Sequence, residues 1–309
     1  MSVSRRPQPS ESAIRRKSVM ADKATIGNVE VTAVIDMVPP PREPSAMFPD
    51  VPADAWANYQ DTLEDGQLQL YYGVFLLKTS EHVILVDTGM GPGPHPDRGN
   101  RTGNLYEELR PHLESNVGVN NTNVGPSDSV NYIIHTHLHG DHVGWNLRYS
   151  GGMPAPNFRR ARYVMSRPDY DYFTSDEGRQ MYPYIDRQVM PLRRLRLQQI
   201  LEEPEHVISD EISIAPAPGH TPGHQVVLID SNGQRGIVMG DVLHTIAQVS
   251  EPDWCAGVDT DKAQSAASRA KWLDAAEEGD WTICAGHFPP GKQVGKIARV
   301  DGKRVWQPL

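Results

Sequence analysis

The sequence predicts a mixed α/β fold of the α+β type, and two observations lead to this prediction. Strand-like segments come before a helix in the first half of the chain, and the second half repeats this order, without the regular strand–helix alternation of a doubly wound parallel sheet. In both halves, histidine or aspartate stands at the carboxyl ends of strand-like segments. The two halves therefore share one plan.

The first half is expected to hold several strands and one amphipathic helix. Leu105, Leu109 and Leu113 recur every four residues, which predicts a helix over residues 104–115, with Pro111 as an imperfection. Strands are expected at 29–38, twice within 71–91, at 132–134 and at 161–166, followed by a mixed helical region up to about residue 200.

The second half is expected to be richer in strands. Residues 261–279 are alanine-rich and end at Gly279, a common helix terminator, so a helix is expected there. Asp301 and Gly302 are turn-forming residues, which predicts a hairpin over 296–306. The remaining strands are expected at 211–219, 225–230, 236–241 and 281–287.

Two segments lie outside this plan. Residues 1–28 are expected to form a flexible tail or arm before a single domain of residues 29–309. Residues 39–56, here called the proline-rich segment, cannot form a central strand or a long helix, because proline lacks an amide donor. Apolar side chains on a long loop are unfavourable in water, so they are expected to wall a binding site or to meet a second subunit. These side chains are Met47, Phe48 and Trp56.

The composition excludes several classes of protein. The 309 residues carry a formal net charge of −9, which argues against a protein that binds the phosphate backbone of nucleic acids. No stretch approaches the roughly 20 apolar residues of a membrane helix. Cys255 and Cys284 are too few for a disulfide framework, and no apolar region follows Arg5 and Arg6, so a cytoplasmic protein with reduced thiols is expected.

The segment NYIIHTHLHGDHVGW (131–145) concentrates imidazoles after an apolar strand. On extended backbone, residues two apart point the same way, so His137 and His139 are expected to hold one ion together. Gly140 permits a turn, and Asp141 and His142 beyond it are expected to face a second ion. Neutral imidazoles and carboxylates suit Zn²⁺ and similar borderline ions, although iron, manganese and cobalt fit the same donors.

Three distant strand ends repeat this pattern. His220 follows APG, Asp241 follows IVMG and His287 follows ICAG. A single histidine at a strand end is usually structural, but a purely structural explanation requires four such motifs to coincide. The set predicts two adjacent divalent metal ions with a shared carboxylate and a bridging hydroxide.

The motifs T-H-x-H-x-D-H, G-H-T-P-G-H, G-D and G-H resemble, as a set, those of the metallo-β-lactamase-fold hydrolase superfamily, and the resemblance covers roughly residues 29–309. It implies an αββα sandwich of two mixed β-sheets flanked by helices, with the metals at one edge. It also implies that His137, His139 and His220 hold the first metal, that Asp141, His142 and His287 hold the second, and that Asp241 bridges them.

The bridging Asp241 narrows the resemblance to one branch. True zinc β-lactamases generally lack this aspartate, whereas glyoxalase II-like enzymes, acyl-homoserine lactonases and the methyl-parathion-hydrolase-like group have it. The segments GDVLHTIAQVSEPDW and GKIARVDGKRVWQPL look most like the last group. Lactonases often place a tyrosine three residues after the bridging aspartate, where this chain has His244.

The expected activity is hydrolysis of an ester or lactone bond in a small, partly apolar substrate. Asp141 and Asp241 would orient and hold the nucleophile, and His244 would contact substrate or protonate the leaving group, or else act only as a supporting imidazole. A phosphotriesterase is the closest alternative, followed by a thioester hydrolase or a β-lactamase-like enzyme. A di-iron redox protein, a binding module that has lost its ligands and a nuclease fit less well. The resemblance also favours a homodimer.

Other polar and aromatic residues have two explanations each. His135 is expected to pack away from the metals, and His224 to support the site or the fold. Asp87 is expected either to cap a turn or to accept a hydrogen bond from a ligating imidazole. Six aromatic residues are expected either to line a pocket or to pack in the core: Trp145, Tyr170, Tyr172, Phe173, Tyr182 and Tyr184. Substrate specificity is expected to depend on residues 39–72 and 145–200.

Overall fold

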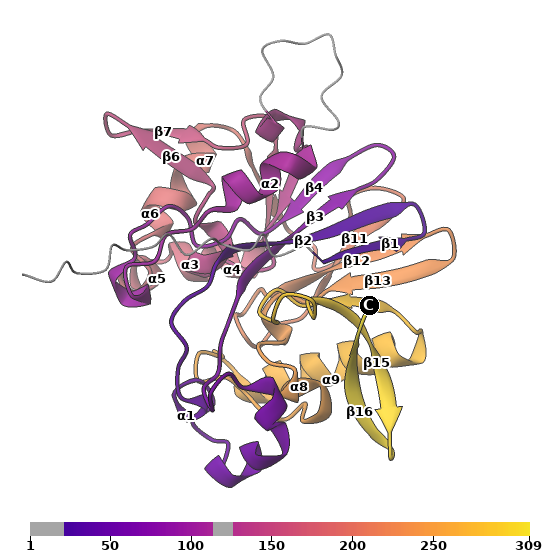
Figure 1. Ribbon diagram of the computed structural model, residues 1–309. Coiled ribbons are helices and arrows are strands. Elements are labelled where there is room, and N and C mark those ends of the chain that lie inside the picture. The colour runs from indigo at the N-terminus through magenta and orange to yellow at the C-terminus, as the bar shows by residue number, and fades with distance from the viewer. Residues whose placement is uncertain (1–21, 114–125) are drawn as a thin grey trace, which may run out of the picture.

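The computed structural model describes residues 22–113 and 126–309, and two seven-stranded mixed sheets form its centre (Figure 1). In the first sheet, the four strands from β4 to β9 run parallel to one another and the others are antiparallel. In spatial order, these strands are β1 (Lys23–Ile26), β2 (Val29–Met37), β3 (Tyr72–Lys78), β4 (Val83–Val86), β5 (Tyr132–Ile134), β8 (Arg162–Ser166) and β9 (Gln198–Leu201).

The second sheet follows the chain order, and only β13 and β14 within it pair in parallel. Its strands are β10 (His206–Val207), β11 (Ile212–Pro216), β12 (Gln225–Ser231), β13 (Gln234–Val238), β14 (Thr282–Cys284), β15 (Val294–Val300) and β16 (Lys303–Pro308). A small hairpin stands apart from both sheets and consists of β6 (Leu147–Ser150) and β7 (Met153–Pro156).

Apolar side chains on both faces of the strands fill two hydrophobic cores, one on each side of the first sheet. In β5, Ile133 belongs to the core between the first sheet and its helices, whereas Ile134 belongs to the core between the two sheets. Leu76 and Leu77 of β3 divide in the same way. Successive side chains of a strand point to opposite faces, so nearly continuous apolar strands serve two cores at once.

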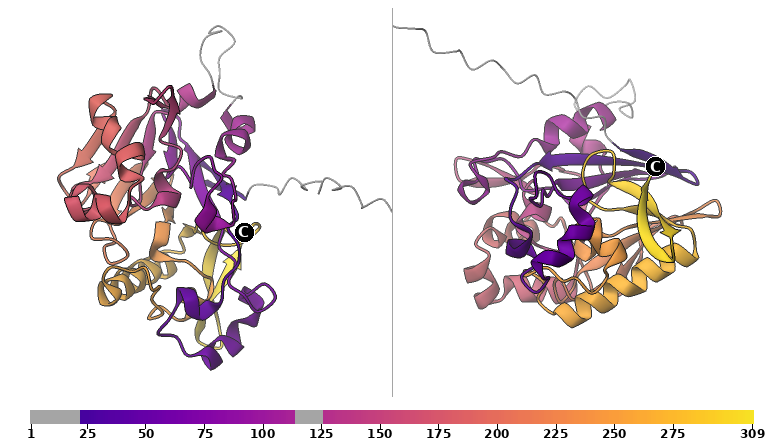
Figure 2. Two further views of the ribbon diagram at one scale, coloured as in Figure 1. Left: turned by 90° about the vertical axis from the view of Figure 1, so that its left-hand side faces the viewer. Right: turned by 60° about the horizontal axis from the view of Figure 1, so that its bottom comes forward.

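Helices cover the outer face of each sheet. On the first sheet these are α2 (Leu105–Leu113), α4 (Arg167–Thr174), α5 (Asp176–Met181), α6 (Ile185–Gln188) and α7 (Met190–Arg194). The longest helix of the described residues, α9 (Lys262–Glu278), lies on the second sheet (Figure 2). It buries Trp272, Leu273 and Ala276. Helices therefore flank two packed sheets, which confirms the αββα sandwich. No helix in the described part of the chain has the length and apolar character needed to cross a bilayer.

Several expected boundaries differ from the observed ones. Residues 23–26, expected in the tail, form β1 and pair with β2, while residues 1–21 lie outside the described residues. Strand β9 replaces the end of the helical region that was expected up to about residue 200, and the hairpin β6–β7 forms where no element was expected. The helix at 104–115 is described as far as Leu113, with Pro111 inside it. Both cysteines are free and buried, as expected.

The proline-rich segment forms neither a central strand nor a long α-helix. It contains the short helix α1 (Pro44–Met47) and runs into a 3-10 helix, Ala53–Thr62. Phe48 and Trp56 are buried, with ring centroids 5.6 Å apart, and Trp56 also packs at 4.7 Å on Trp254. The chain therefore covers the apolar side chains of this segment by itself.

Candidate metal centre

The predicted ligand residues meet at one edge of the sandwich, where strands of both sheets end. His137 and His139 follow β5, and the chain then turns into the short helix α3 (Gly140–Val143), which carries Asp141 and His142. The remaining three follow strands of the second sheet: His220 lies between β11 and β12, Asp241 after β13 and His287 after β14.

These seven side chains form two groups. His137, His139, His220 and Asp241 make up the first group, and Asp141, His142 and His287 make up the second; within each, the potential ligand atoms lie within 4.8 Å of one another. Asp241 faces both groups, because its Oδ2 lies 3.2 Å from His220 Nε2 and its Oδ1 lies 3.0 Å from His287 Nε2. This is the position that a bridging carboxylate requires.

Acceptors outside the cluster fix the orientation of two imidazoles. His220 Nδ1 lies 2.8 Å from Asp259 Oδ1, and His287 Nδ1 lies 2.9 Å from the carbonyl oxygen of Tyr71. Both acceptors can only receive a proton at these contacts, so each Nδ1 donates. The opposite nitrogen of each ring, Nε2, then presents a lone pair to the cluster.

Asp87 orients two further rings. His142 Nδ1 donates to Asp87 Oδ2 at 2.8 Å, and Thr136 Oγ1 donates to the same oxygen at 2.7 Å. Because the Thr136 hydroxyl proton is used there, its oxygen accepts from His137 Nδ1 at 3.0 Å. Asp87 itself has a φ of 64°, a left-handed conformation that is uncommon for aspartate and that these hydrogen bonds hold in place. Of the two expected roles of Asp87, the structure shows the hydrogen bond to an imidazole of the cluster.

The convergence of lone pairs shows that the site fits a cation. His139 Nδ1 lies 3.0 Å from His137 Nε2 and 2.9 Å from His220 Nε2. His142 Nε2 is buried, has no hydrogen bond among the described residues and lies 3.1 Å from Asp241 Oδ1. Buried nitrogen lone pairs that face one another are unfavourable unless a positive ion lies between them. Imidazole and carboxylate donors of this kind suit a borderline divalent metal.

Burial sets the protonation of two histidines of the first group, His137 and His139. It is the largest cause that lowers the pKa of His137 and His139 well below the usual range, so both rings are neutral, the form in which histidine binds metals. Burial by itself raises the pKa of Asp241, but the surrounding histidines, His287 and His142 foremost, outweigh it and hold that pKa well below its usual range. Asp241 is therefore an anion surrounded by imidazoles.

His244 lies inside the cluster. Its Nε2 is 3.2 Å from Asp241 Oδ2, and its ring stacks on His287 with centroids 5.4 Å apart and planes at 8°. It is buried, and it lines the same cavity as the ligand groups. The structure thus places His244 beside the shared carboxylate.

His135 and His224 lie behind the cluster. His135 is buried, with Nδ1 3.7 Å from Asp87 Oδ1, and it belongs to neither ligand group. His224 Nε2 accepts a hydrogen bond of 3.0 Å from the amide of Asp241, so it holds the main chain that carries the shared carboxylate. The expected packing of His135 and the expected supporting role of His224 agree with these contacts.

Two supporting aspartates could not be found from the sequence. Asp259 fixes His220 from a loop before α9. Burial raises its pKa, but His220, His244 and Arg269 together outweigh burial and leave the pKa at about 2. Asp169 accepts from Thr221 Oγ1 at 2.9 Å and from the Gly223 amide at 2.6 Å, which fixes the turn that carries His220. No spacing pattern links either aspartate to the turn, because only the folded chain brings them together.

A cavity of about 500 Å³ opens over the ligand groups. Tyr172, Tyr182 and Tyr184 line it, whereas Tyr170 and Phe173 pack in the core of the first sheet. Trp145 donates from Nε1 to Asp36 Oδ1 at 2.8 Å and does not line the cavity. The proline-rich segment contributes Met47 to the wall, but Phe48 and Trp56 pack among the segment's own neighbours. The expectation that all three wall the site was therefore wrong for two of them.

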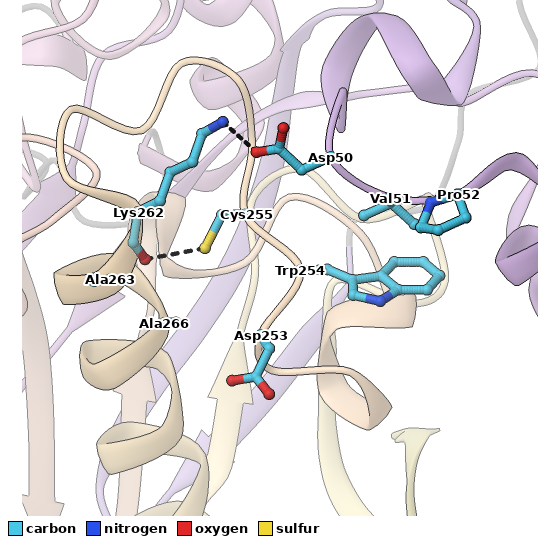
Figure 3. A pocket seen from close by; sticks show the side chains of 9 residues that line it. All are labelled: Asp50, Val51, Pro52, Asp253, Trp254, Cys255, Lys262, Ala263 and Ala266. Carbon is cyan, nitrogen blue, oxygen red and sulfur yellow. Dashed lines mark hydrogen bonds and ion pairs between the residues drawn. The ribbon is translucent and has the colours of Figure 1, made fainter.

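A second cavity of about 320 Å³ lies between the proline-rich segment and the start of α9 (Figure 3). Lys262 Nζ pairs with Asp50 Oδ2 at 2.5 Å, and Cys255 Sγ donates to the Lys262 carbonyl oxygen at 3.1 Å. The side chain of Trp254 lies beside Val51 and Pro52. None of the predicted site residues lines this cavity, so the chemistry belongs to the first one.

Comparison with known proteins agrees with this geometry. A curated N-acyl homoserine lactonase from Bacillus sp is 28% identical over 222 residues, which cover 70% of this chain and 81% of the relative. The N-acyl homoserine lactonase AiiA of Bacillus thuringiensis subsp. kurstaki is 27% identical over 209 residues, with 66% and 76% of the two chains covered.

Solved structures share the whole fold. The hydrolase AbOPH of the beta lactamase superfamily superposes with a TM-score of 0.76 at 22% identity, over 95% of this chain and 99% of that one. AidC, a dizinc quorum-quenching lactonase, superposes with a TM-score of 0.73 at 20% identity, over 94% and 98%. The model of the metallo-beta-lactamase superfamily matches residues 73–287. The chain therefore belongs to the metallo-beta-lactamase superfamily, in which it is a metallohydrolase of the lactonase-like branch.

Proposed function

We propose that this protein is a dinuclear metal-dependent hydrolase that opens an ester or lactone bond of a small, partly apolar substrate. The observation that carries the proposal is the position of Asp241, whose two oxygens face two separate groups of histidines. A single metal would need only one of these groups. The N-acyl homoserine lactonases among its relatives support a lactone as the substrate class.

In this proposal, His137, His139 and His220 hold one ion, and Asp141, His142 and His287 hold the other, with Asp241 shared. Two divalent ions, when bound, lower the pKa of a water molecule and polarise the electrophile that it attacks. The ligand chemistry favours zinc, because five of the seven side chains are imidazoles.

The protein supplies orientation and charge. Asp259, Asp87 and the Tyr71 carbonyl keep the ligand nitrogens turned inward before any ion or substrate binds, so little reorganisation is needed. Asp141 is half-buried on the cavity wall and is placed to accept a hydrogen bond from the attacking water. His244 lines the same cavity and is placed to hold the leaving group.

The cavity sets the size and polarity of the substrate. About 500 Å³ is in the range of pockets that take small organic molecules. Tyrosine, leucine and methionine side chains form much of its wall, which suits an acyl chain or a ring. A polymer is disfavoured, because the site is a cavity and the net charge of the chain is negative.

A hydrolysis panel on protein of known metal content tests the proposal. The panel contains acyl-homoserine lactones, aryl esters, thioesters, phosphotriesters and β-lactams, and elemental analysis counts the metal ions per chain. Two metals and the highest kcat/KM on lactones or esters are expected. A fully active preparation with one metal or none would contradict the dinuclear site, and a preference for phosphotriesters would favour the alternative activity.

A further inference from the structure

The cavity over the metal centre has a polar corner that holds none of the ligand groups. Arg42, Tyr72 and Arg98 line this corner. Arg98 Nε donates to the Tyr72 hydroxyl oxygen at 2.8 Å, and Arg98 Nη1 pairs with Asp97 Oδ2 at 2.7 Å. These three residues, the arginine corner, have no part in holding the metals.

The hydroxyl of Tyr72 has a proton to donate and no acceptor for it in the described part of the chain. Its oxygen already accepts from Arg98, and no acceptor for its proton occurs among residues 22–113 and 126–309. Burial is the main cause that raises the pKa of Tyr72 to about 12, so the O–H stays intact at neutral pH. The Tyr72 ring meets the His287 ring edge-on at 5.9 Å, which places this donor beside the metal centre.

Arg42 brings a second free donor to the corner. Its main chain is fixed, because its amide donates to the Leu68 carbonyl at 3.1 Å and its carbonyl accepts from the Leu68 amide at 2.8 Å. Its guanidinium has no hydrogen bond or ion pair with any residue that the structure describes. Arg42 and Tyr72 line the same cavity, so the positive charge of Arg42 lies on the same wall as the Tyr72 hydroxyl.

The charge of the cavity wall favours an anion. Outside the ligand groups, the charged side chains of the wall are Arg42, Asp97 and Arg98, which leaves an excess of positive charge in a chain of net charge −9. Guanidinium and phenol donors that converge on one point match the oxygens of a carboxylate. The other lining side chains are mostly apolar or aromatic, so the positive charge is confined to the corner.

We propose that the arginine corner binds a carboxylate carried by the substrate, so that the enzyme prefers an ester or lactone bearing a carboxylate to a neutral one of the same size. This inference rests on the proposed hydrolytic function. Arg42 and the Tyr72 hydroxyl hold the carboxylate, and Arg98 keeps Tyr72 in place. The scissile carbonyl then lies over the metal centre.

Two esters with the same leaving group test the inference. In mono-(4-nitrophenyl) adipate a carboxylate replaces the terminal methyl of 4-nitrophenyl hexanoate, and the rate without enzyme is subtracted for both. The ratio of their kcat/KM values should favour the adipate ester by about 10- to 100-fold, mainly through KM, because charge-assisted hydrogen bonds have that strength. Raising the salt concentration should reduce the ratio.

Variants of the corner should change the ratio while both metals remain bound. Arg42→Ala should bring it close to one, and Arg42→Glu should invert it. Tyr72→Phe should lower it several-fold. Arg160→Glu, which makes the same charge change at an exposed position outside the cavity, should leave it unchanged. Metal content and circular dichroism show whether each variant is folded.

The outcomes separate this inference from the proposed function. A wild-type ratio of one or below, or a ratio that Arg42→Glu does not alter, overturns the arginine corner while hydrolysis stands. If Tyr72→Phe lowers kcat/KM equally on both esters, the inference is overturned as well, because Tyr72 would then act on the reacting oxygen and not on the carboxylate. If neither ester is hydrolysed, the panel of lactones and other substrates decides the proposed function, and calorimetry decides the corner by comparing adipate binding to metal-loaded wild type and Arg42→Glu.

Discussion

At the scale of single residues, Asp241 makes the strongest test of the metal centre. Each of its oxygens faces a different group of histidines, so its loss removes one ligand from both ions and leaves their positive charges balanced by one fewer anion. Asp241→Ala should lower kcat by at least about 10²-fold and weaken at least one metal site by a similar factor. Turnover and metal content are measured together, and near-normal turnover with two bound metals would show that the bridge is wrongly placed.

His244 also acts at this scale, because its ring stacks on His287 and contacts Asp241. If it holds the leaving group, His244→Ala should keep both metals and lose about 10²–10⁴-fold in kcat on alkyl esters, with a smaller loss on nitrophenyl esters, which need little help in leaving. The slope of log kcat against leaving-group pKa measures this. An equal loss across the series would indicate positioning, and a lost metal would make His244 a ligand.

At the scale of elements, the proline-rich segment should be held by its own aromatic cluster. Trp56 is buried between Phe48 and Trp254, so Trp56→Ala should reduce the free energy of unfolding by about 3–5 kcal/mol, as for other large cavities. Urea denaturation measures this loss. The metals should stay bound, since no ligand comes from this segment. A Trp56→Ala protein of unchanged stability would mean that the segment contributes little to the fold.

The same scale shows how far the sequence predicts the structure. The ligands at the ends of β5, β13 and β14 were predictable, because apolar runs that stop at histidine or aspartate are visible in the sequence. Strand β1 was not, since four residues of mixed polarity become a strand only by pairing with β2. Asp259 and Asp169 were missed for a related reason: their partners are far away in the chain, and no local pattern requires an aspartate there.

At the scale of the whole molecule, acid should weaken the metal-free fold in a defined range. The histidines beside Asp87 and Asp259 outweigh burial and hold both carboxyl pKa values at about 2, below the unfolded value of about 3.9. Depressed carboxyl pKa values stabilise the fold above about pH 4, and this stability is lost as the pH falls toward 2. Each group contributes on the order of 2 kcal/mol. Urea denaturation of chelator-treated protein at several pH values should show this loss of unfolding free energy. In Asp259→Asn, the unfolding free energy should depend less on pH between about 4 and 2. The same pH dependence in Asp259→Asn and wild type would contradict the role given to Asp259.

The homodimer expected from the family resemblance stays a prediction. Exposed apolar side chains in the proline-rich segment no longer support it, because Phe48 and Trp56 are covered within the chain and do not need a second subunit. Light scattering at micromolar concentration should give twice the mass of the 309-residue chain, and a mass of one chain would end this expectation. The cytoplasmic location is likewise a prediction from the sequence.

The loop that carries Asp259 has a consequence for how such an enzyme diverges. Gly257, Val258 and Thr260 of this loop line the substrate cavity, while Asp259 between them fixes the ligand His220. Selection for a new substrate at this wall therefore risks weakening metal retention. Met47, in the proline-rich segment, also lines the cavity, but neither of its neighbours in the chain fixes a ligand, so its side chain can vary more freely. New specificities should accumulate first in the proline-rich segment and its surroundings, with the Asp259 loop changing last.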